Sequence, residues 1–112
     1  MKKFLVVYHA TSGAMEQMAT LTPAQQKAGM DEWMSWAKEV GSALVDLGSP
    51  LGNGMSLASK GAVASAKEVA GYSVMQAESM NAVLGLLKRH PHFRMPGQCS
   101  IEVHEALALP GM

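Results

Sequence analysis

The chain has 112 residues, which is the size of one domain and excludes two independent hydrophobic cores. Nine Lys and Arg residues balance nine Asp and Glu residues, so the net charge is zero and there is no basic field to attract a nucleic-acid backbone. Hydrophobic residues make up 48% of the chain and charged residues 16%, which predicts a folded protein with apolar surface left over for a subunit interface.

Cysteine usage and hydropathy indicate the compartment. The one cysteine, Cys99, cannot form an internal disulfide or a cysteine-rich zinc site, so we expect a cytoplasmic protein. The apolar run Phe4–Tyr8 is too short for the core of a secretory signal. No stretch approaches the ~18 apolar residues of a membrane span, and we expect neither a membrane nor a nucleic acid as a partner.

The first quarter of the chain predicts a strand followed by a long helix. Phe4–Tyr8 is β-branched and aromatic, which is typical of a central strand that is apolar on both faces. Residues 10–21 form a connection with about one helical turn. The long helix then begins at Thr22, because Thr22 can cap it, Pro23 suits the first helical position and Gln25 completes a capping box.

Apolar residues recur along this helix at spacings of three and four, opposite a polar face. We expect the helix to end at Gly48 and to be followed by a loop over residues 48–54. Residues 55–59 then predict an edge strand and residues 60–67 a hairpin connection to the next strand, Val69–Ala77. The expected packed face of the helix consists of Met30, Trp33, Met34, Ala37, Val40, Leu44 and Leu47.

The last third predicts a second helix and a final strand. Ser79 can cap the helix, and Pro91 ends it. A loop over His90–Gln98 precedes the strand Ser100–Glu105, in which apolar and polar residues alternate. The order strand, helix, strand, strand, helix, strand is that of a ferredoxin-like α+β fold, with a four-stranded antiparallel sheet and two helices on one face. We expect one such domain over residues 1–112, and a homodimer that buries the other, apolar sheet face.

Four short motifs, spread over nearly the whole chain, resemble YCII-related proteins. They are Lys3–Tyr8, Leu47–Leu51, Gly71–Ala77 with the following Glu78-Ser79, and His90-Pro91-His92 before Ile101–Val103. The resemblance implies a dimeric α+β barrel, in which two ferredoxin-like sheets pack face to face. It leaves the reaction open, because the wider superfamily includes monooxygenases, lactone isomerases, dehydratases, haem proteins and non-enzymes.

The resemblance also bears on the site. The best-known family members resemble enzymes with a histidine on the first helix beside an aspartate, but this chain has no histidine between His9 and His90. The Asp-Gly-Pro-Phe motif of another branch is absent as well. An Asp-Pro-Tyr type turn that lines the pocket mouth in relatives corresponds to His90-Pro91-His92, so the resemblance implies that His92 lies at a pocket.

Two histidines are candidate proton carriers, since histidine titrates near neutral pH. The first and last strands of this fold are antiparallel neighbours, so His9 is expected to approach the loop that holds His92. Glu102 and His104 lie two residues apart and share one face of the last strand. They are candidates for ligand binding and acid/base work, and a polar subunit interface is the other interpretation.

Candidate ligand contacts come from the long helix and the aromatic residues. Gln26 shares the apolar stripe with Trp33, although it could equally hydrogen-bond the backbone near the helix start. Tyr8, Trp33 and Phe93 could wall an apolar pocket, and core packing is their ordinary role. The turn His90-Pro91-His92 alone lacks the converging ligands of a metal site, so we expect no metal and no cofactor.

These observations predict a small, partly apolar metabolite bound between the long helix and the sheet. If the protein is an enzyme, cofactor-free acid/base chemistry of an isomerase or lactone type fits the candidate residues best. Two alternatives remain open: a non-catalytic dimeric binding or regulatory module, and a cofactor-free enzyme resembling the monooxygenases of the superfamily.

Overall fold

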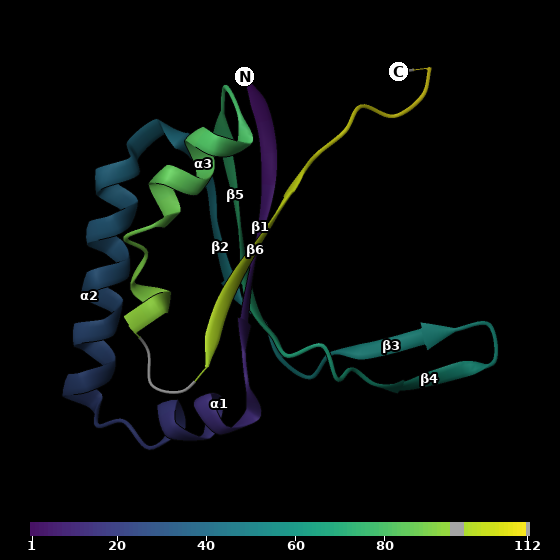
Figure 1. The fold of residues 1–112 in the computed structure, drawn as a ribbon. Coiled ribbons are helices and arrows are strands. Elements are labelled where there is room, and N and C mark those ends of the chain that lie inside the picture. Colours follow the sequence, from purple (N-terminus) through teal and green to yellow (C-terminus); the bar gives the residue numbers. More distant parts are fainter. Residues whose placement is uncertain (95–97, 112) are drawn as a thin grey trace.

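The computed structural model describes residues 1–94 and 98–111 of the chain. Its main sheet is antiparallel and has the strand order β2-β5-β1-β6 (Figure 1). Two helices lie on one face of this sheet, which confirms the predicted ferredoxin-like α+β fold. The four strands are β1 (Lys2–Ala10), β2 (Leu44–Pro50), β5 (Val69–Ala77) and β6 (Cys99–Glu105).

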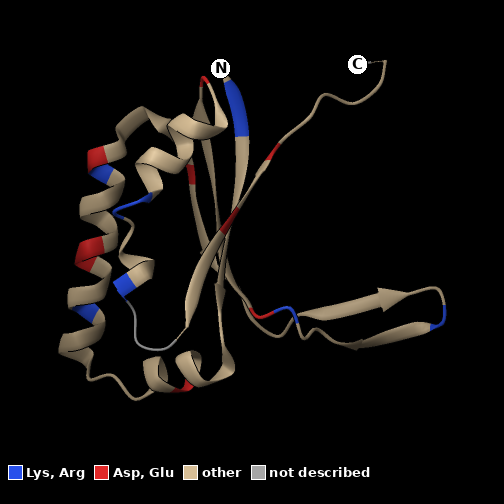
Figure 2. Ribbon diagram, in the orientation of Figure 1, with Lys and Arg blue, Asp and Glu red and all other residues tan. Residues whose placement is uncertain are grey.

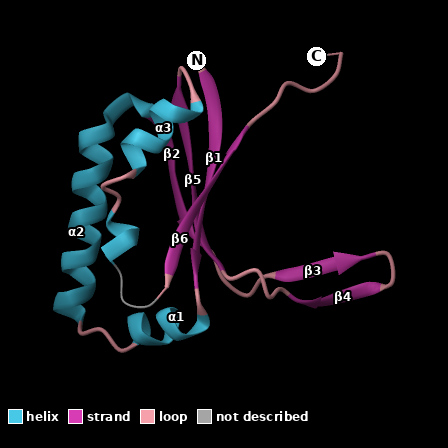
Figure 3. Cartoon of the chain, viewed as in Figure 1, coloured by secondary structure: helices cyan, strands magenta, loops and turns pink. Residues whose placement is uncertain are grey.

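The two helices on the sheet are α2 (Pro23–Val40) and α3 (Met80–Leu87) (Figure 3). The predicted capping box is present, since the Thr22 hydroxyl accepts from the Gln25 amide at 3.2 Å and the Gln25 side chain accepts from the Thr22 amide at 2.9 Å. Ser79 caps α3 as predicted. Among the described residues, no helix is both long enough and apolar enough to cross a membrane.

The long helix is shorter than its sequence pattern predicts. It ends at Val40, not at Gly48, because Gly41 adopts a φ of 56° that takes the backbone out of the helix. A short 3-10 turn, η1 (Gly41–Ala43), then leads into β2. Leu44 and Leu47 fit the helical spacing only by coincidence, and both lie in the edge strand.

Gly48 has a different role from the predicted helix stop. It lies within β2 at a φ of 81°, in a stretch where the pairing with β5 shifts register twice. A Cβ atom at this position would stand 1.7 Å from the carbonyl oxygen of Tyr72 on β5. Only glycine therefore allows β2 to approach β5 this closely.

The strand predicted at residues 55–59 exists but does not join the main sheet. It is β3 (Met55–Ala58), which pairs with β4 (Gly61–Ala64) in a separate hairpin. This hairpin projects away from the main sheet (Figure 1). The edge position predicted for residues 55–59 belongs to β2, and the predicted hairpin connection over residues 60–67 contains the strand β4.

Two predicted connections also contain more structure than expected. The segment after β1 holds an eight-residue helix, α1 (Ser12–Ala19), where the sequence predicted one turn, and the Thr11 hydroxyl caps it. The loop predicted over His90–Gln98 begins with a 3-10 turn, η2 (Pro91–Arg94). Residues 95–97 of that loop lie outside the described residues.

The core lies between the sheet and the helices, and it is uneven. Alternate residues of β1, from Phe4 to Tyr8, are at most 2% exposed, and α3 buries Val83 against them. On α2 the buried residue is Trp36, whereas Met30 and Met34, both predicted on the packed face, are 57% and 51% exposed. A cleft lies between residues 25–33 of α2 and the sheet.

Candidate functional site

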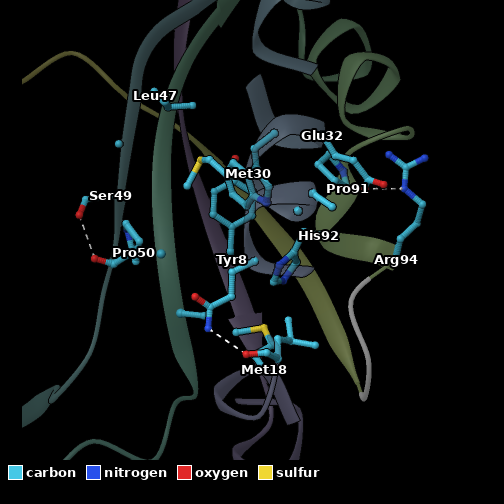
Figure 4. Close-up of a pocket in the computed structure, with 18 of the residues that line it drawn as sticks. Tyr8, Met18, Met30, Glu32, Leu47, Ser49, Pro50, Pro91, His92 and Arg94 are labelled. Carbon is cyan, nitrogen blue, oxygen red and sulfur yellow. Dashed lines mark hydrogen bonds and ion pairs between the residues drawn. The ribbon is translucent and has the colours of Figure 1, made fainter. Parts of the chain in front are cut away.

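This cleft has a volume of about 690 Å³ and lies between α2 and the end of the sheet nearest η2 (Figure 4). Such a volume suits one small organic molecule, and a mostly apolar lining with a few polar groups is typical of ligand sites. Residues of β1, α1, α2, β2, β5 and η2 line the cleft. The lining residues that bear most on its chemistry are Tyr8, Gln26, Met30, Trp33, His92 and Arg94.

A chain of hydrogen bonds runs across the sheet under the cleft. The Tyr8 hydroxyl donates to Ser73 Oγ at 2.9 Å, and Ser73 Oγ donates to the Leu47 carbonyl oxygen at 2.6 Å. Burial raises the pKa of Tyr8 to about 12, and the hydrogen bond with Ser73 offsets part of that rise. Tyr8 therefore keeps its proton at neutral pH and contributes a fixed aromatic surface.

His92 is held in one tautomer. Its side chain is buried, and Nε2 lies 2.8 Å from the carbonyl oxygen of His9. A carbonyl oxygen only accepts, so Nε2 carries the proton and Nδ1 is the basic nitrogen. Burial lowers the pKa of His92, while hydrogen bonds to the backbone of His9 and Ser100 work against that shift. The ring is therefore neutral near pH 7 and can accept a proton.

His90 shapes the turn that carries His92. It is 1% exposed, and its Nδ1 accepts a hydrogen bond from the backbone amide of His92 at 2.9 Å. The rings of Tyr8, Trp33 and Trp36 surround it, with centroids 4.3 to 4.8 Å away. Burial lowers the pKa of His90 to about 3, with a further contribution from His92. His90 is thus a neutral core residue that positions its neighbour.

Charged and amide groups stand at the mouth of the cleft. Arg94 Nε lies 3.6 Å from Glu32 Oε2, and both side chains are more than half exposed (Figure 4). A guanidinium has five N–H donors, so this one contact leaves Arg94 able to bind an anionic or carbonyl oxygen. Gln26 Nε2 donates to the Leu21 carbonyl oxygen at 3.2 Å, so Gln26 makes the hydrogen bond to the backbone near the helix start that the sequence indicates as one of its two roles. Its side chain also lines the cleft.

Four of the predicted residues meet in this cleft, namely Tyr8, Gln26, Trp33 and His92. The structure places the other four elsewhere. The His9 ring lies on a smaller pocket of about 220 Å³, where Nδ1 is 2.9 Å from the Lys67 carbonyl oxygen, so only its backbone carbonyl serves the site. Phe93 is 51% exposed and does not line the cleft, because the 3-10 turn directs His92 inward and its neighbour outward.

Glu102 and His104 are the remaining two, and they lie on the opposite face of the sheet. His104 Nε2 and Glu102 Oε1 are paired as the sequence predicts, but both side chains are about 60% exposed. The hydrogen bond from His104 lowers the pKa of the Glu102 carboxyl. Because the pair lies on the face away from the helices, it does not line the cleft.

Some residues of the site were missed by sequence reasoning. Ser73 could have been found from the sequence, because it is the polar residue among helix-facing positions of β5 that are otherwise apolar or glycine. Arg94 and Glu32 had no such signal, since their approach depends on how α2 and η2 meet in space. Within residues 1–94 and 98–111, no three His, Cys, Asp or Glu side chains converge in the way that a metal ion requires.

The fold and the cleft together define a class: a ferredoxin-like α+β protein with a small-molecule-sized site between its long helix and its sheet. No protein-family model matches the sequence, and no curated protein does. Among solved structures, the chain is similar to 5-chloro-2-hydroxyhydroquinone dehydrochlorinase (TftG) from Burkholderia phenoliruptrix AC1100, in its complex with 2,5-dihydroxybenzoquinone. The TM-score is 0.52 at 16% identity, over 89% of this chain and 90% of that chain. At this identity the similarity shows the fold.

Proposed function

We propose that the chain is a YCII-related protein that binds a small, partly apolar metabolite in the cleft and performs cofactor-free acid/base chemistry of an isomerase or lactone type. The observation that carries this proposal is His92, a buried and neutral histidine of fixed tautomer on an apolar cleft. A base with these properties abstracts a proton best when water is excluded around it.

Each group at the cleft has a part in such a reaction. The rings of Tyr8 and Trp33 offer flat apolar surfaces to a planar substrate. His92 accepts the substrate proton at Nδ1 and returns it to another atom of the same molecule. Arg94 stabilises the negative charge that develops on a substrate oxygen meanwhile. His9 takes part through its carbonyl oxygen, which keeps the His92 proton on Nε2.

The structural neighbour supports this choice of ligand class. That protein is a dehydrochlorinase, and its bound molecule is a dihydroxybenzoquinone, a planar ring with polar oxygens. A molecule of that shape matches a cleft with aromatic walls and a few polar groups at one side. We extend the ligand class to this chain, and not the particular reaction.

We also propose that the protein is a cytoplasmic homodimer. Leu5 pairs with Val74 and Val7 pairs with Tyr72 across β1 and β5, so four apolar side chains form a patch on the sheet face without helices. Leu5 is 43% exposed there, which favours burial against a second copy. The free Cys99 supports a reducing compartment.

A thermal-shift titration with 2,5-dihydroxybenzoquinone and a panel of phenols and lactones tests the function. Bound ligand stabilises the folded state by ~2.7 kcal/mol at a concentration of about 100 Kd, so the melting temperature of the wild type should rise. The His92→Gln variant keeps a side-chain amide that can donate to the His9 carbonyl but lacks a basic nitrogen. We expect it to fold and to bind the ligand about tenfold more weakly than the wild type.

The matched control is His104→Gln, which makes the same chemical change on the opposite face of the sheet. It should respond to ligand as the wild type does. Equal responses in all three proteins would remove His92 from the site. No response across the whole panel would favour the non-catalytic binding or regulatory module.

A further inference from the structure

The hairpin formed by β3 and β4, here called the arm (residues 54–65), has no packing partner of its own. In the part of the chain that the structure describes, its two strands pair only with each other, and a hydrogen bond from the Ser65 amide to the Gly54 carbonyl closes its base. All eight strand residues are exposed. An isolated two-stranded hairpin is marginally stable in water, so this arm needs a surface to cover it.

One face of the arm is apolar. The register places Met55 opposite Ala64 and Leu57 opposite Ala62, and side chains of paired residues lie on the same side. Leu57 is 82% exposed and Met55 is 64% exposed. Lys60, in the turn, carries the one charge among residues 55–64, and the ribbon of the arm is otherwise uncharged (Figure 2). A projecting hairpin that stays in water usually carries charges on both faces.

The protomer as a whole exposes more surface than its mass requires. Its accessible surface is 7797 Å², whereas a monomeric protein of 11.9 kDa exposes about 6,000 Å². Its radius of gyration is 15.5 Å, against about 13 Å for a compact domain of this length. The excess of about 1,800 Å² exceeds the ~800 Å² that each partner buries in a stable interface.

The direction of the arm indicates what covers it. The arm and the segment 106–111 both leave the sheet on the side opposite α2 and α3, one near each end of the strands (Figure 1). Leu107 and Leu109 in that segment are 77% and 65% exposed. A partner that packs on the apolar patch of the open sheet face therefore lies between the arm and the segment 106–111.

We propose that the arm clasps a second copy of this chain, with Leu57 and Met55 packed on the partner protomer. This inference rests on the proposed homodimer and adds to it the element that secures the pair. The arm extends about 16 Å beyond its base at ~3.3 Å per residue, whereas packed sheets lie about 10 Å apart. The arm is therefore long enough to extend beyond the interface between the two open sheet faces and to contact the side of the partner protomer. Two-fold symmetry gives every protomer both an arm and a surface that receives one.

Sedimentation equilibrium of three variants beside the wild type tests the inference. One variant replaces residues 55–64 with Asn-Gly, which closes the hairpin at its base with a two-residue turn. The second carries Met55→Lys and Leu57→Lys and keeps the backbone of the arm. The control is Leu84→Lys, an exposed leucine on α3 in the helix layer.

We expect a wild-type dimer, a dimer dissociation constant at least tenfold higher in both arm variants, and an unchanged constant in the control. A monomeric wild type would overturn the homodimer itself. A wild-type dimer whose dissociation constant is the same in the Lys variant, with circular dichroism confirming its fold, would overturn the role of the arm alone. The Lys variant thus tests the arm even if the shortened chain fails to fold.

Discussion

The two faces of the main sheet are built from the same strands, and each face holds a hydrogen-bonded histidine. On the helix face His92 is 2% exposed and bonded to the backbone of β1, and its pKa is lowered by burial. On the open face His104 is bonded to Glu102, but about 60% of each side chain is in water. The sequence makes His92 a candidate proton carrier, and it makes Glu102 and His104 candidates for ligand binding and acid/base work, with a polar subunit interface as the other interpretation. The structure shows that the coverage of the face by helices, and not pairing with a carboxylate, determines which histidine is shielded from water.

The largest expected effect is a difference in unfolding free energy between substitutions at two neighbouring residues of β1, one on each face of the sheet. Phe4 faces the helices and is fully buried, whereas Leu5 faces the open side and is 43% exposed. Phe4→Ala should lower the free energy of unfolding by about 3–5 kcal/mol through the lost contacts and the cavity. Leu5→Ala should cost about 1 kcal/mol or less in the separate protomer. Urea unfolding at low protein concentration measures both values.

Repeating these two measurements at higher protein concentration tests whether the open face is buried in a dimer. If the open face is buried in a dimer, the cost of Leu5→Ala should grow with concentration while that of Phe4→Ala stays constant. Equal costs at every concentration would contradict the assignment of the two faces.

The pH dependence of stability should come from the helix face. The pKa of His90 is about 3 in the folded protein and about 6.5 when the ring is exposed. The unfolded chain therefore binds more protons between these values, so stability is full above pH 6.5 and falls as the pH drops toward 3. The slope is at most ~1.4 kcal/mol per pH unit for one proton.

His90→Asn should reduce this slope, because Asn cannot titrate but its side-chain oxygen can still accept from the His92 amide. The lowered pKa of His92 should leave part of the slope in place. The slope is compared between pH 7 and pH 5 in the variant and in the wild type. Urea unfolding at the two pH values provides the measurement. A slope as steep in His90→Asn as in the wild type would assign the titration to other groups.

The smallest effect is expected at the exposed pair. Glu102→Gln removes the charge partner of His104, but water solvates both side chains, and exposed ion pairs contribute little to stability. The urea midpoint at pH 7 should therefore match that of the wild type in the separate protomer. A clear loss of stability at low protein concentration would show that the open face is less exposed than the structure indicates.

Much of the fold follows from local sequence. The capping box at Thr22, the cap at Ser79 and the alternation in β6 each act within a few residues, so their chemistry can be read directly. The element order then yields the ferredoxin-like arrangement. The approach of His9 to the loop that holds His92 could be predicted because the first strand and the loop before the last strand are neighbours in that arrangement.

The errors come from patterns that two structures satisfy equally. Leu44 and Leu47 suit the face of a helix as well as an edge strand, and the sequence gives no sign that Gly41 adopts a positive φ. Residues 55–59 alternate as a strand does, but alternation does not say which sheet a strand joins. The cleft was predicted in position and with Gln26 and His92 among its polar groups. Arg94 and Glu32 were not predicted, because they meet only once α2 and η2 are packed.

The close approach at Gly48 limits how this protein can change over evolution. The cleft is bounded there by backbone, and a side chain of any size would collide with the carbonyl of Tyr72. Met30, on the opposite wall, is 57% exposed, has no such restriction and could be exchanged for a larger or smaller side chain. New ligand preferences would therefore arise by substitution on α2. The wall formed by β2 at Gly48 would keep its shape, and each new ligand would have to fit against it.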